Sequence, residues 1–385
     1  MNGRSGQDGA ADGLGVALVL GSSTGGIGAH VASLAGGLAA GGARVTVCGP
    51  ADAEELFGFT GRGAGFVPVE IPANPRLRDA RAVLALRSSL AAAEPDVVHA
   101  HGLRAGFVAA AARGGRPLVV TWHNAVLGSG GGLRGRANRR IEGWVARAAD
   151  ITLCASTDLV ERASALGARD VRLAEVAAPT LPARRRSAAR VRRELGLAPG
   201  APLVLSVGRL HPQKRYDVLV AAAARWRRLS PAPLVVVAGR GPSYIELSAQ
   251  ISRERAPVLL AGHRTDVADL LGAADLAVVT SAWEARQLFA QEALAAGVPL
   301  VATRVGGIPE LVGDAAVLVP PGDVDALDAA VRQLLGDAQL RRSYAERGSA
   351  QARTWPTERD TVDQVRNVYA ELVAPARPAG EAGPP

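Results

Sequence analysis

The sequence has few aromatic residues and cysteines, and it lacks long apolar runs. Aromatic residues make up 4% of the 385 residues, so the cores are expected to be aliphatic. Cys48 and Cys154 lie far apart and each ends an apolar run, which predicts buried thiols in a reducing compartment. The sequence contains neither a run of about 18 apolar residues that would span a membrane nor an apolar leader before the first expected strand. We therefore expect a cytoplasmic protein.

The chain also lacks the pattern of a nucleic-acid-binding protein. Its formal net charge is +8, and a basic protein binds nucleic acid, an anionic membrane surface or acidic small molecules. Aromatic residues do not interleave with the basic ones, which argues against nucleic acid. An Ala/Arg bias, typical of a GC-rich genome, accounts for part of the charge.

What the sequence does contain is an alternation of short apolar runs with longer, helix-period segments. This alternation favours parallel sheets covered by helices, and the length favours two domains. The expected strands are 16–20, 44–48, 66–71, 97–99, 118–122 and 151–154 in the first half, and 203–207, 234–238, 258–261, 276–279, 300–302 and 317–319 in the second. The expected helices are 27–40, 79–93, 138–148, 216–229, 287–296, 324–335 and 357–372.

The alternation stops at a segment rich in proline and arginine near residues 177–199, which is expected to connect the domains. The predicted organisation is a disordered start (1–13), an N-terminal domain (14–180), a linker (181–199), a C-terminal domain (200–355), a last helix (356–374) that packs back on the N-terminal domain, and a disordered tail (375–385). Pro356 predicts a break before that helix.

Three groups of residues are candidates for chemistry. Gly25 and Gly26 follow the first expected strand and open a helix, where backbone N–H groups and the helix dipole favour a phosphate. This glycine turn also occurs where a helix and a strand simply pack closely, and no acidic residue ends the second strand to bind a ribose.

The second group follows the strand at 203–207. Gly208, Arg209 and Lys214 lie just past its end, where the two cations are well placed to hold a diphosphate. The alternative is a pair of solvated surface cations.

The third group is a pair of glutamates, Glu284 and Glu292, with seven residues between them. The first is expected in a loop and the second in the following helix. At about 1.5 Å per residue, they are spaced to meet two parts of one ligand. Surface glutamates on helices are common, so the pair alone also fits a solvated helix face.

Taken together, these groups resemble the family 4 retaining glycosyltransferases. The resemblance covers nearly the whole chain and is carried by the motifs GGIGAH, VVHAH, VVTWHN, VGRLHPQK, GRGP, WEARQLFAQEALAAGVPLVAT and VGGIPELV. It implies the α/β GT-B fold, in which two Rossmann-like domains with parallel sheets face each other across a cleft that holds the active site.

The resemblance implies a role for each matching residue. Arg209 and Lys214 would hold the donor diphosphate, Glu292 the ribose and Glu284 the sugar ring, while His123 would reach the sugar from the acceptor side. Further donor contacts are implied for Gly25, Gly26, Gly208, Gly239, His263, Arg264 and the loop residues Ala285, Arg286, Gln287 and Leu288. His30, His101 and Asn124 are the candidates on the acceptor side, whereas His99 is expected to be structural.

One departure concerns the residues after Glu284. Many relatives have Gly-Phe-Gly there, whereas this chain has Ala285-Arg286-Gln287. Arg286 would place a bulky cation near the far hydroxyls of the sugar. The identity of the donor is therefore less transferable than the fold.

The expected activity is transfer of a sugar from a nucleotide-diphosphate sugar to a hydroxyl acceptor, with retention at the anomeric carbon. The sugar is interpreted as a hexose, and the acceptor as a glycan, a glycolipid or a small metabolite.

His, Cys and Asp residues show no metal-ligand spacing, so neither a metal nor another cofactor is expected. The arginine-rich segments 133–141 and 184–193 are candidates for contact with an anionic membrane, with a solvated face as the alternative. A non-catalytic nucleotide-sugar-binding protein and an epimerase-like or phosphorylase-like enzyme of the same fold stay open.

Overall fold

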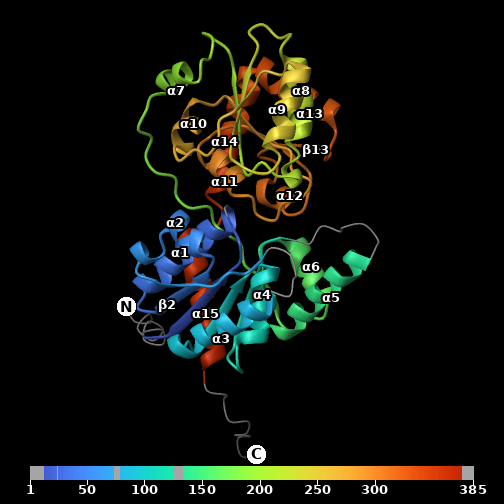
Figure 1. The fold of residues 1–385 in the computed structure, drawn as a ribbon. Helices are drawn as coiled ribbons and strands as arrows, with labels where there is room; N and C mark the ends of the chain where they lie inside the picture. The colour runs from blue at the N-terminus through green and yellow to red at the C-terminus, as the bar shows by residue number, and fades with distance from the viewer. Residues whose placement is uncertain (1–12, 24, 73–78, 125–132, 375–385) are drawn as a thin grey trace, which may run out of the picture.

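The computed structural model describes residues 13–23, 25–72, 79–124 and 133–374. The ends expected to be disordered, 1–13 and 375–385, lie outside these residues except for Gly13. Two parallel sheets, each covered by helices, form the two lobes in Figure 1. The predicted α/β class with two Rossmann-like halves is confirmed.

The N-terminal sheet has seven parallel strands in the order β3-β2-β1-β4-β5-β6-β7. Its strands are β1 (Gly15–Leu20), β2 (Arg44–Gly49), β3 (Gly65–Pro68), β4 (Val97–His101), β5 (Leu118–Trp122), β6 (Ile151–Cys154) and β7 (Val171–Leu173). The order reverses between β1 and β4, and in such sheets ligands bind at the carboxyl ends of the strands beside that reversal.

The C-terminal sheet has six parallel strands in the order β10-β9-β8-β11-β12-β13. Its strands are β8 (Leu203–Val207), β9 (Leu234–Ala238), β10 (Val258–Leu260), β11 (Leu276–Val279), β12 (Leu300–Thr303) and β13 (Val317–Val319). Here the order reverses between β8 and β11, so the loops that follow these two strands are the natural place for a ligand.

Helices cover both faces of each sheet. Those of the N-terminal half are α1 (Gly26–Ala40), α2 (Ala51–Phe57), α3 (Asp79–Ala93), α4 (Leu103–Ala112), α5 (Leu133–Ala148) and α6 (Thr157–Ala165). The later ones are α7 (Ala188–Glu194), α8 (Tyr216–Trp226), α9 (Tyr244–Glu254), α10 (Val267–Ala273), α11 (Leu288–Ala295), α12 (Ile308–Val312), α13 (Val324–Gly336), α14 (Ala338–Ala352) and α15 (Glu358–Val373), with short 3-10 turns η1 (Thr60–Arg62) and η2 (Pro212–Lys214).

Each sheet is buried between two aliphatic layers. The side chains of β1, β4 and β5 are at most a few per cent exposed and alternate between two core clusters, one on each face. Strands β8 and β11 divide their side chains between the two clusters of the C-terminal half in the same way. Burial on both faces explains why these strands appear in the sequence as continuous apolar runs.

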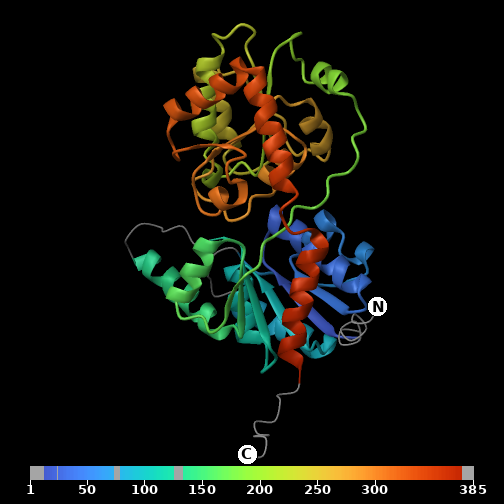
Figure 2. The ribbon, with the colours of Figure 1, turned by 180° about the vertical axis from the view of Figure 1, so that it is seen from behind.

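The last helix crosses back from the C-terminal half. Figures 1 and 2 show α15 lying along the N-terminal lobe, where Val365, Val368 and Tyr369 join its core beside α1. Thr357 and Asp360 form a capping box at the start of α15, directly after the break expected at Pro356. The chain therefore passes between the two sheets twice within the described residues.

The first of these two passages is not entirely irregular. Residues 188–194, inside the segment expected to be a linker, form α7, and Val191 is buried in the core of the C-terminal half. A short arginine-rich helix with a single buried apolar residue gives too weak a periodic signal to be recognised from sequence. The exact domain limits, 14–180 and 200–355, stay predictions.

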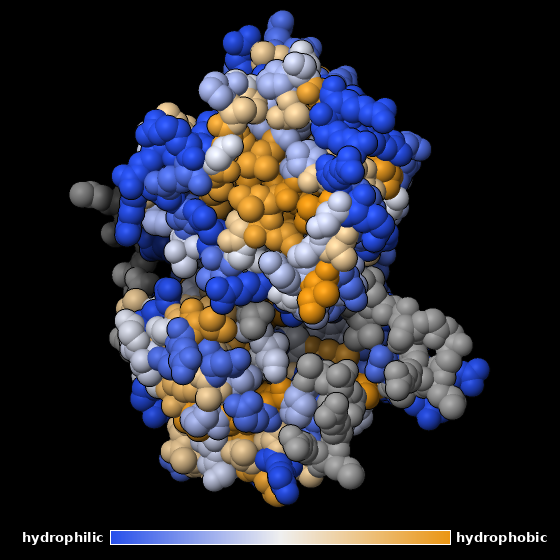
Figure 3. All heavy atoms as spheres, turned by 45° about the horizontal axis from the view of Figure 1, so that its top comes forward, coloured by the Kyte–Doolittle hydropathy of each residue, from blue (hydrophilic) through white to orange (hydrophobic). Residues whose placement is uncertain are grey.

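The surface of the C-terminal lobe is uneven in polarity. In Figure 3 its apolar side chains gather in the centre of the viewed face between hydrophilic margins. None of the helices among the described residues is both long and apolar enough to cross a membrane.

Candidate active site

The centre of the C-terminal half of the site is an ion pair between Lys214 and Glu284. Lys214 ends the turn η2, and its Nζ lies 2.5 Å from Oε1 of Glu284 in the loop after β11. Ser281 donates a hydrogen bond of 2.6 Å to the same oxygen, and Thr280 donates one of 2.8 Å to the backbone carbonyl of Lys214. The two loops at the strand-order reversal are therefore fastened to each other.

Gly208 and Gly239 allow these loops to approach closely. A Cβ on Gly239 would lie 1.9 Å from the carbonyl oxygen of Gly208. A Cβ on Gly208 would lie 2.8 Å from the Tyr216 hydroxyl and within van der Waals reach of the Lys214 side chain. Any larger residue at either position would displace the loop that holds Lys214.

Arg209 is exposed beside this ion pair. The pKa of His211 is lowered mainly by burial, and the positive charges of Arg209 and Lys214 lower it further. His211 is held in place by accepting a hydrogen bond of 3.2 Å from the backbone N–H of Gln213. Arg209 and Lys214 place two cations in the loop after β8, the kind of side chains that bind a diphosphate.

The segment 281–288, named here the donor loop, carries four of the predicted donor residues after Glu284. Ala285 is buried, and Gln287 caps α11 by accepting a hydrogen bond of 2.6 Å from the N–H of Ala290. Leu288 begins α11 and reaches across to the N-terminal half, where its side chain lies 3.2 Å from the position of a Cβ on Gly26. Gly25 is the N-cap of α1 beside it.

Sequence reasoning missed the support beneath the donor loop. The N–H of Gly307 donates a hydrogen bond of 2.9 Å to the carbonyl oxygen of Glu284. A Cβ on Gly306 would lie 2.0 Å from that same oxygen. The signal in the sequence is the glycine pair in VGGIPELV, which resembles the glycine pair that opens α1.

Glu292 lies on α11, four residues after the helix begins, and is not in direct contact with the Lys214–Glu284 pair. It lines a cavity of about 540 Å³ between α10, α11 and the first interdomain passage. Burial raises the pKa of Glu292 to about 7. A carboxyl group held in this way at the edge of a cavity is suited to accept hydrogen bonds from ligand hydroxyls.

The N-terminal half of the site is a cluster of histidines. His30 comes from α1, His101 ends β4 and His123 follows β5, and all three are at most 8% exposed. Nδ1 of His101 lies 3.2 Å from Nε2 of His123, and the ring of His30 is 5.5 Å from that of His101 and 5.2 Å from that of His123. Asn124 is exposed beside them.

Behind this cluster, His99 has the structural role expected for it. Its Nδ1 lies 2.6 Å from the hydroxyl of Tyr369 on α15, and its Nε2 lies 2.6 Å from the hydroxyl of Thr121. Helix α15 thus supports the histidine cluster through the contact between Tyr369 and His99.

Burial keeps these imidazoles neutral. It lowers the pKa of His30 to about 4 and that of His99 to about 3, and it holds the pKa of His101 and of His123 well below 6.5. Nε2 of His101 is buried and has no hydrogen-bond partner among the described residues. A neutral imidazole has one donor and one acceptor nitrogen, and this nitrogen is left unpaired inside the cluster.

The expectation that no metal is bound stays a prediction, although the fold brings three histidines together. The ligand nitrogens of His30, His101 and His123 lie within 4.8 Å of one another, although the sequence shows no metal-ligand spacing. Three neutral imidazoles are a donor set that zinc accepts. The set contains no carboxylate to balance an ion, and two of its nitrogens already lie at hydrogen-bonding distance from each other.

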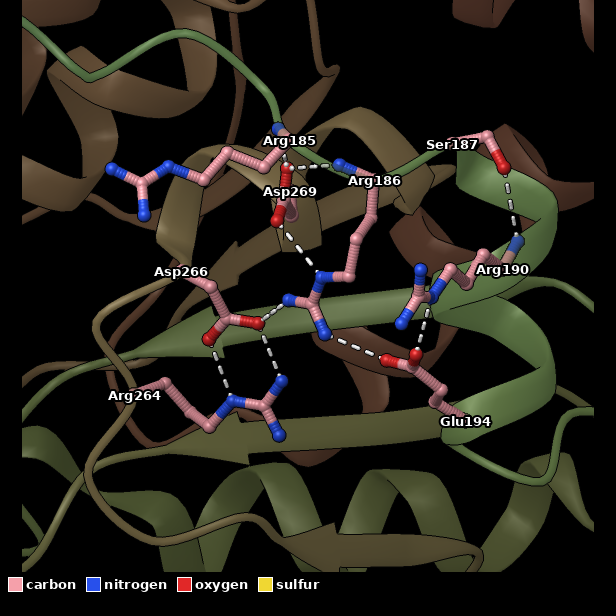
Figure 4. A network of polar contacts seen from close by, with 8 residues as sticks. All are labelled: Arg185, Arg186, Ser187, Arg190, Glu194, Arg264, Asp266 and Asp269. Atoms are coloured by element: carbon pink, nitrogen blue, oxygen red, sulfur yellow. Dashed lines mark hydrogen bonds and ion pairs between the residues drawn. The ribbon is translucent and has the colours of Figure 1, made fainter.

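The loop that carries the predicted donor contacts His263 and Arg264 is partly occupied by internal contacts. His263 is exposed, whereas Arg264 pairs with Asp266 at 2.6 Å. Figure 4 shows Asp266 shared with Arg186, which also pairs with Asp269 and Glu194. At least part of the arginine-rich segment 184–193 therefore fastens the first passage to the C-terminal half.

The two halves of the site also touch through side chains that the sequence did not single out. Nε1 of Trp283 donates a hydrogen bond of 2.8 Å to Asp158 on α6, and Glu310 on α12 accepts one from the Thr157 hydroxyl. Trp283 joins the core of the N-terminal half. The donor loop is thereby held between both lobes.

Comparison with known proteins agrees with this geometry. Residues 25–179 match the family described as "Glycosyl transferase 4-like domain", and residues 187–351 match "Glycosyl transferases group 1". A D-inositol 3-phosphate glycosyltransferase of Salinispora arenicola is 35% identical, covering 76% of this chain and 72% of its own length. The chain is a family 4-like GT-B glycosyltransferase.

Other relatives of this glycosyltransferase carry different names. The glycogen synthase of Mycobacterium tuberculosis is 34% identical over 66% of this chain and 64% of its own length. Among solved structures, an Anabaena protein, HepE, in complex with UDP and glucose superposes with a TM-score of 0.79 at 21% identity, covering 92% of this chain and 99% of that one. This likeness shows the GT-B fold over nearly the whole chain.

Proposed function

We propose that this glycosyltransferase moves a hexose from a nucleotide-diphosphate sugar to a hydroxyl acceptor with retention of anomeric configuration. The observation that supports the proposal best is the position of two unlike surfaces. The cationic edge around Lys214 and Glu284 belongs to one half, the neutral histidine cluster belongs to the other, and Gly26 meets Leu288 where the halves join.

The charges of the site residues support a separate role for each of them. Arg209 and Lys214 stabilise the negative charge that develops on the departing diphosphate, and this frees Glu284 from its partner to meet the sugar ring. Glu292 accepts hydrogen bonds from the ribose hydroxyls. His123 and His101 orient the sugar and acceptor hydroxyls without adding charge.

A front-face route suits this arrangement. In that route the acceptor attacks from the side on which the diphosphate leaves, and a phosphate oxygen takes the acceptor's proton. The protein then contributes position and electrostatic stabilisation rather than a nucleophile. Because Arg209 and Lys214 supply the positive charge, the reaction requires no metal, and activity is expected to survive treatment with a chelator.

The acceptor is proposed to be a small polar molecule. The names of two relatives, the Salinispora arenicola D-inositol 3-phosphate glycosyltransferase and an N-acetyl-alpha-D-glucosaminyl L-malate synthase of Bacillus anthracis, contain inositol 3-phosphate and malate, small polar molecules with a free hydroxyl. Neutral imidazoles suit a hydroxyl group, and the exposed arginines Arg136 and Arg139 on α5 are available for a negatively charged group or an anionic membrane surface.

The experiment is a thermal-shift panel of UDP-, GDP- and ADP-sugars on the wild type, Glu292→Ala and the matched control Glu246→Ala, an exposed residue on α9. A ligand that binds the native state raises the melting temperature by mass action. One donor should shift the wild type and the control but not Glu292→Ala. NMR of the product made from that donor should show the donor's anomeric configuration.

Two outcomes would overturn the proposal. An inverted product would exclude the retaining mechanism. Tight binding of a donor with no transfer to any hydroxyl acceptor and no hydrolysis would favour a non-catalytic nucleotide-sugar-binding protein.

A further inference from the structure

Arg286 is a buried cation in the donor loop, two residues after Glu284. It is 8% exposed, although arginine is almost never buried without a partner. The site chemistry described above leaves it without a role. Its contacts therefore indicate what it does.

Those contacts join the donor loop to both passages between the lobes. Nη1 of Arg286 pairs with the carboxylate of Glu175, which follows β7 at the start of the first passage. The carbon at the centre of its guanidinium lies 5.8 Å from the centre of the Trp355 ring, in the second passage. A guanidinium over an aromatic face at this distance is a favourable contact.

Each partner is itself anchored. The carbonyl oxygen of Glu175 accepts a hydrogen bond of 3.4 Å from Thr361 on α15, and Nε1 of Trp355 donates one of 3.1 Å to the carbonyl oxygen of Leu311 on α12. Arg286 thus bridges one segment that is tied to the N-terminal lobe and one that is tied to the C-terminal lobe.

The helix that follows reinforces the first of these attachments. Gln291 on α11 accepts a hydrogen bond of 3.0 Å from the N–H of Ala178 and donates one of 3.1 Å to the carbonyl oxygen of Val176. Together with the ion pair at Glu175, these bonds hold the donor loop and α11 against residues 175–178.

The ion pair is the sensitive member of this set. Nε and Nη2 of Arg286 are buried and have no hydrogen-bond partner within the described part of the chain. Removing the Glu175 carboxylate leaves the buried charge of Arg286 with only the weaker electrostatic attraction of Glu310, which is unfavourable. Loss of the Glu175 carboxylate would therefore displace Arg286 and the loop that carries it.

We propose that Arg286 is a positioning residue whose ion pair with Glu175 fixes the donor loop relative to both interdomain passages and so sets how the two lobes close on the donor sugar. The inference rests on the proposed function, because Glu284 on this loop is assigned to the sugar ring. It explains a cation at this position without any contact between Arg286 and the substrate.

The test is a double-mutant cycle of Glu175→Gln, Arg286→Gln and the two combined, with kcat measured by release of the nucleoside diphosphate. Each single change should lower kcat by roughly tenfold or more, since small misplacements of a reacting group are costly. The combined variant should lose no more kcat than the more impaired single variant, because both changes remove the same interaction. Binding of the nucleoside diphosphate itself should stay within about threefold of the wild type.

Small-angle X-ray scattering of the same proteins without donor reports on closure independently of activity. The variants should show a more open or more heterogeneous arrangement than the wild type. Arg225→Gln is the matched control, since it removes a 2.5 Å ion pair to Asp325 that lies within the C-terminal half, and it should change neither readout. Glu175→Gln is nearly isosteric at a side chain that is 30% exposed, so it keeps the test valid even if Arg286→Gln does not fold.

The outcomes separate the two proposals. If the wild type binds no nucleoside-diphosphate sugar, the proposed function fails, and scattering still tests the ion pair. Scattering of Glu175→Gln that is identical to the wild type overturns the positioning role in either case. Multiplied losses of kcat in the combined variant would also overturn it, because the two residues would then act separately.

Discussion

The two halves of the site have the same architecture but differ in charge: one carries charged side chains and the other neutral ones. In both, the site lies at the carboxyl ends of parallel strands where the strand order reverses. In the C-terminal half, that edge carries Arg209, Lys214 and Glu284, and in the N-terminal half it carries His30, His101 and His123, which burial keeps neutral. A transfer reaction needs both kinds of surface, because the leaving group is anionic and the incoming hydroxyl is neutral.

The two edges also differ in how the chain builds them. The charged edge comes from two loops, fastened by short-range contacts such as the hydrogen bond between Ser281 and Glu284. The neutral edge is assembled from three separate elements and is supported by a fourth, α15, through the hydrogen bond between Tyr369 and His99. Substitutions at the charged edge are therefore expected to lower kcat, whereas substitutions at the neutral edge are expected to lower the free energy of unfolding.

Lys214→Met should give the largest effect, because it removes the positive charge that we propose stabilises the leaving diphosphate. Losses of roughly 10²–10³-fold in kcat are typical when a group of this kind is removed. The measurement is nucleoside-diphosphate release at saturating donor, with circular dichroism to show that the fold is kept. Activity within about threefold of the wild type would contradict the role given to Lys214.

Acidification should destabilise the protein through the neutral edge. The unfolded state binds protons at these histidines below about pH 6.5, whereas His30 in the folded state does so only near pH 4. The stabilisation is therefore complete above pH 6.5 and is lost as the pH falls toward 4, by up to about 3 kcal/mol from His30 alone.

Urea unfolding at pH 7.5 and pH 5 measures this loss. The difference between the two free energies of unfolding should be smaller in His30→Gln than in the wild type, whereas His263→Gln, on an exposed loop, should leave it unchanged. An equal pH dependence of stability in the wild type and in His30→Gln would show that His30 is not held neutral.

Sequence predicted the charged edge far better than the neutral one. Arg209, Lys214 and Glu284 follow single strands, so local pattern placed each of them in a loop at a strand's carboxyl end. The histidine cluster depends on which strands are neighbours. The pairing of His101 with Thr121 across β4 and β5 brings His123 to the end of the neighbouring strand, and sequence periodicity does not contain that pairing.

Interactions between the lobes were the least predictable. Arg286 was expected near the sugar, whereas its side chain pairs with Glu175, 111 residues away in the sequence. Trp283 and Asp158 were not singled out at all. Such contacts depend on how two independently recognisable domains dock, and that docking leaves no periodic signal.

In the C-terminal half, the buried carboxyl group of Glu292 should also make stability depend on pH. Its pKa is raised to about 7 by burial, so between about pH 4.5 and 7 the folded state holds a proton that the unfolded state has released. Stability from this group therefore falls as the pH rises through that window. Glu292→Gln should be more stable than the wild type at pH 8, by on the order of 1–3 kcal/mol, and nearly equal to it at pH 4.5.

Chemical denaturation at the two pH values, with Glu246→Gln as the control, checks this expectation. A stabilised variant that no longer binds the donor would mean that the carboxyl group is kept for function at a cost in stability. A variant that is less stable at pH 8 would instead show that the Glu292 carboxylate has a stabilising partner in the fold.

Tyr369→Phe should give the smallest effect and would test the support of the neutral edge. The substitution keeps the packing of the ring in the N-terminal core but removes the hydroxyl that lies 2.6 Å from Nδ1 of His99. A buried polar atom left without its partner costs about 1–3 kcal/mol, and a reduced urea midpoint would measure that cost. Because His99 contacts Tyr369 and Thr121 and is not among the residues proposed to hold the diphosphate, binding of the nucleoside diphosphate should be unchanged. Weaker nucleotide binding in this variant would mean that the two edges are coupled through α15, and the division between a chemical half and a structural half would no longer hold.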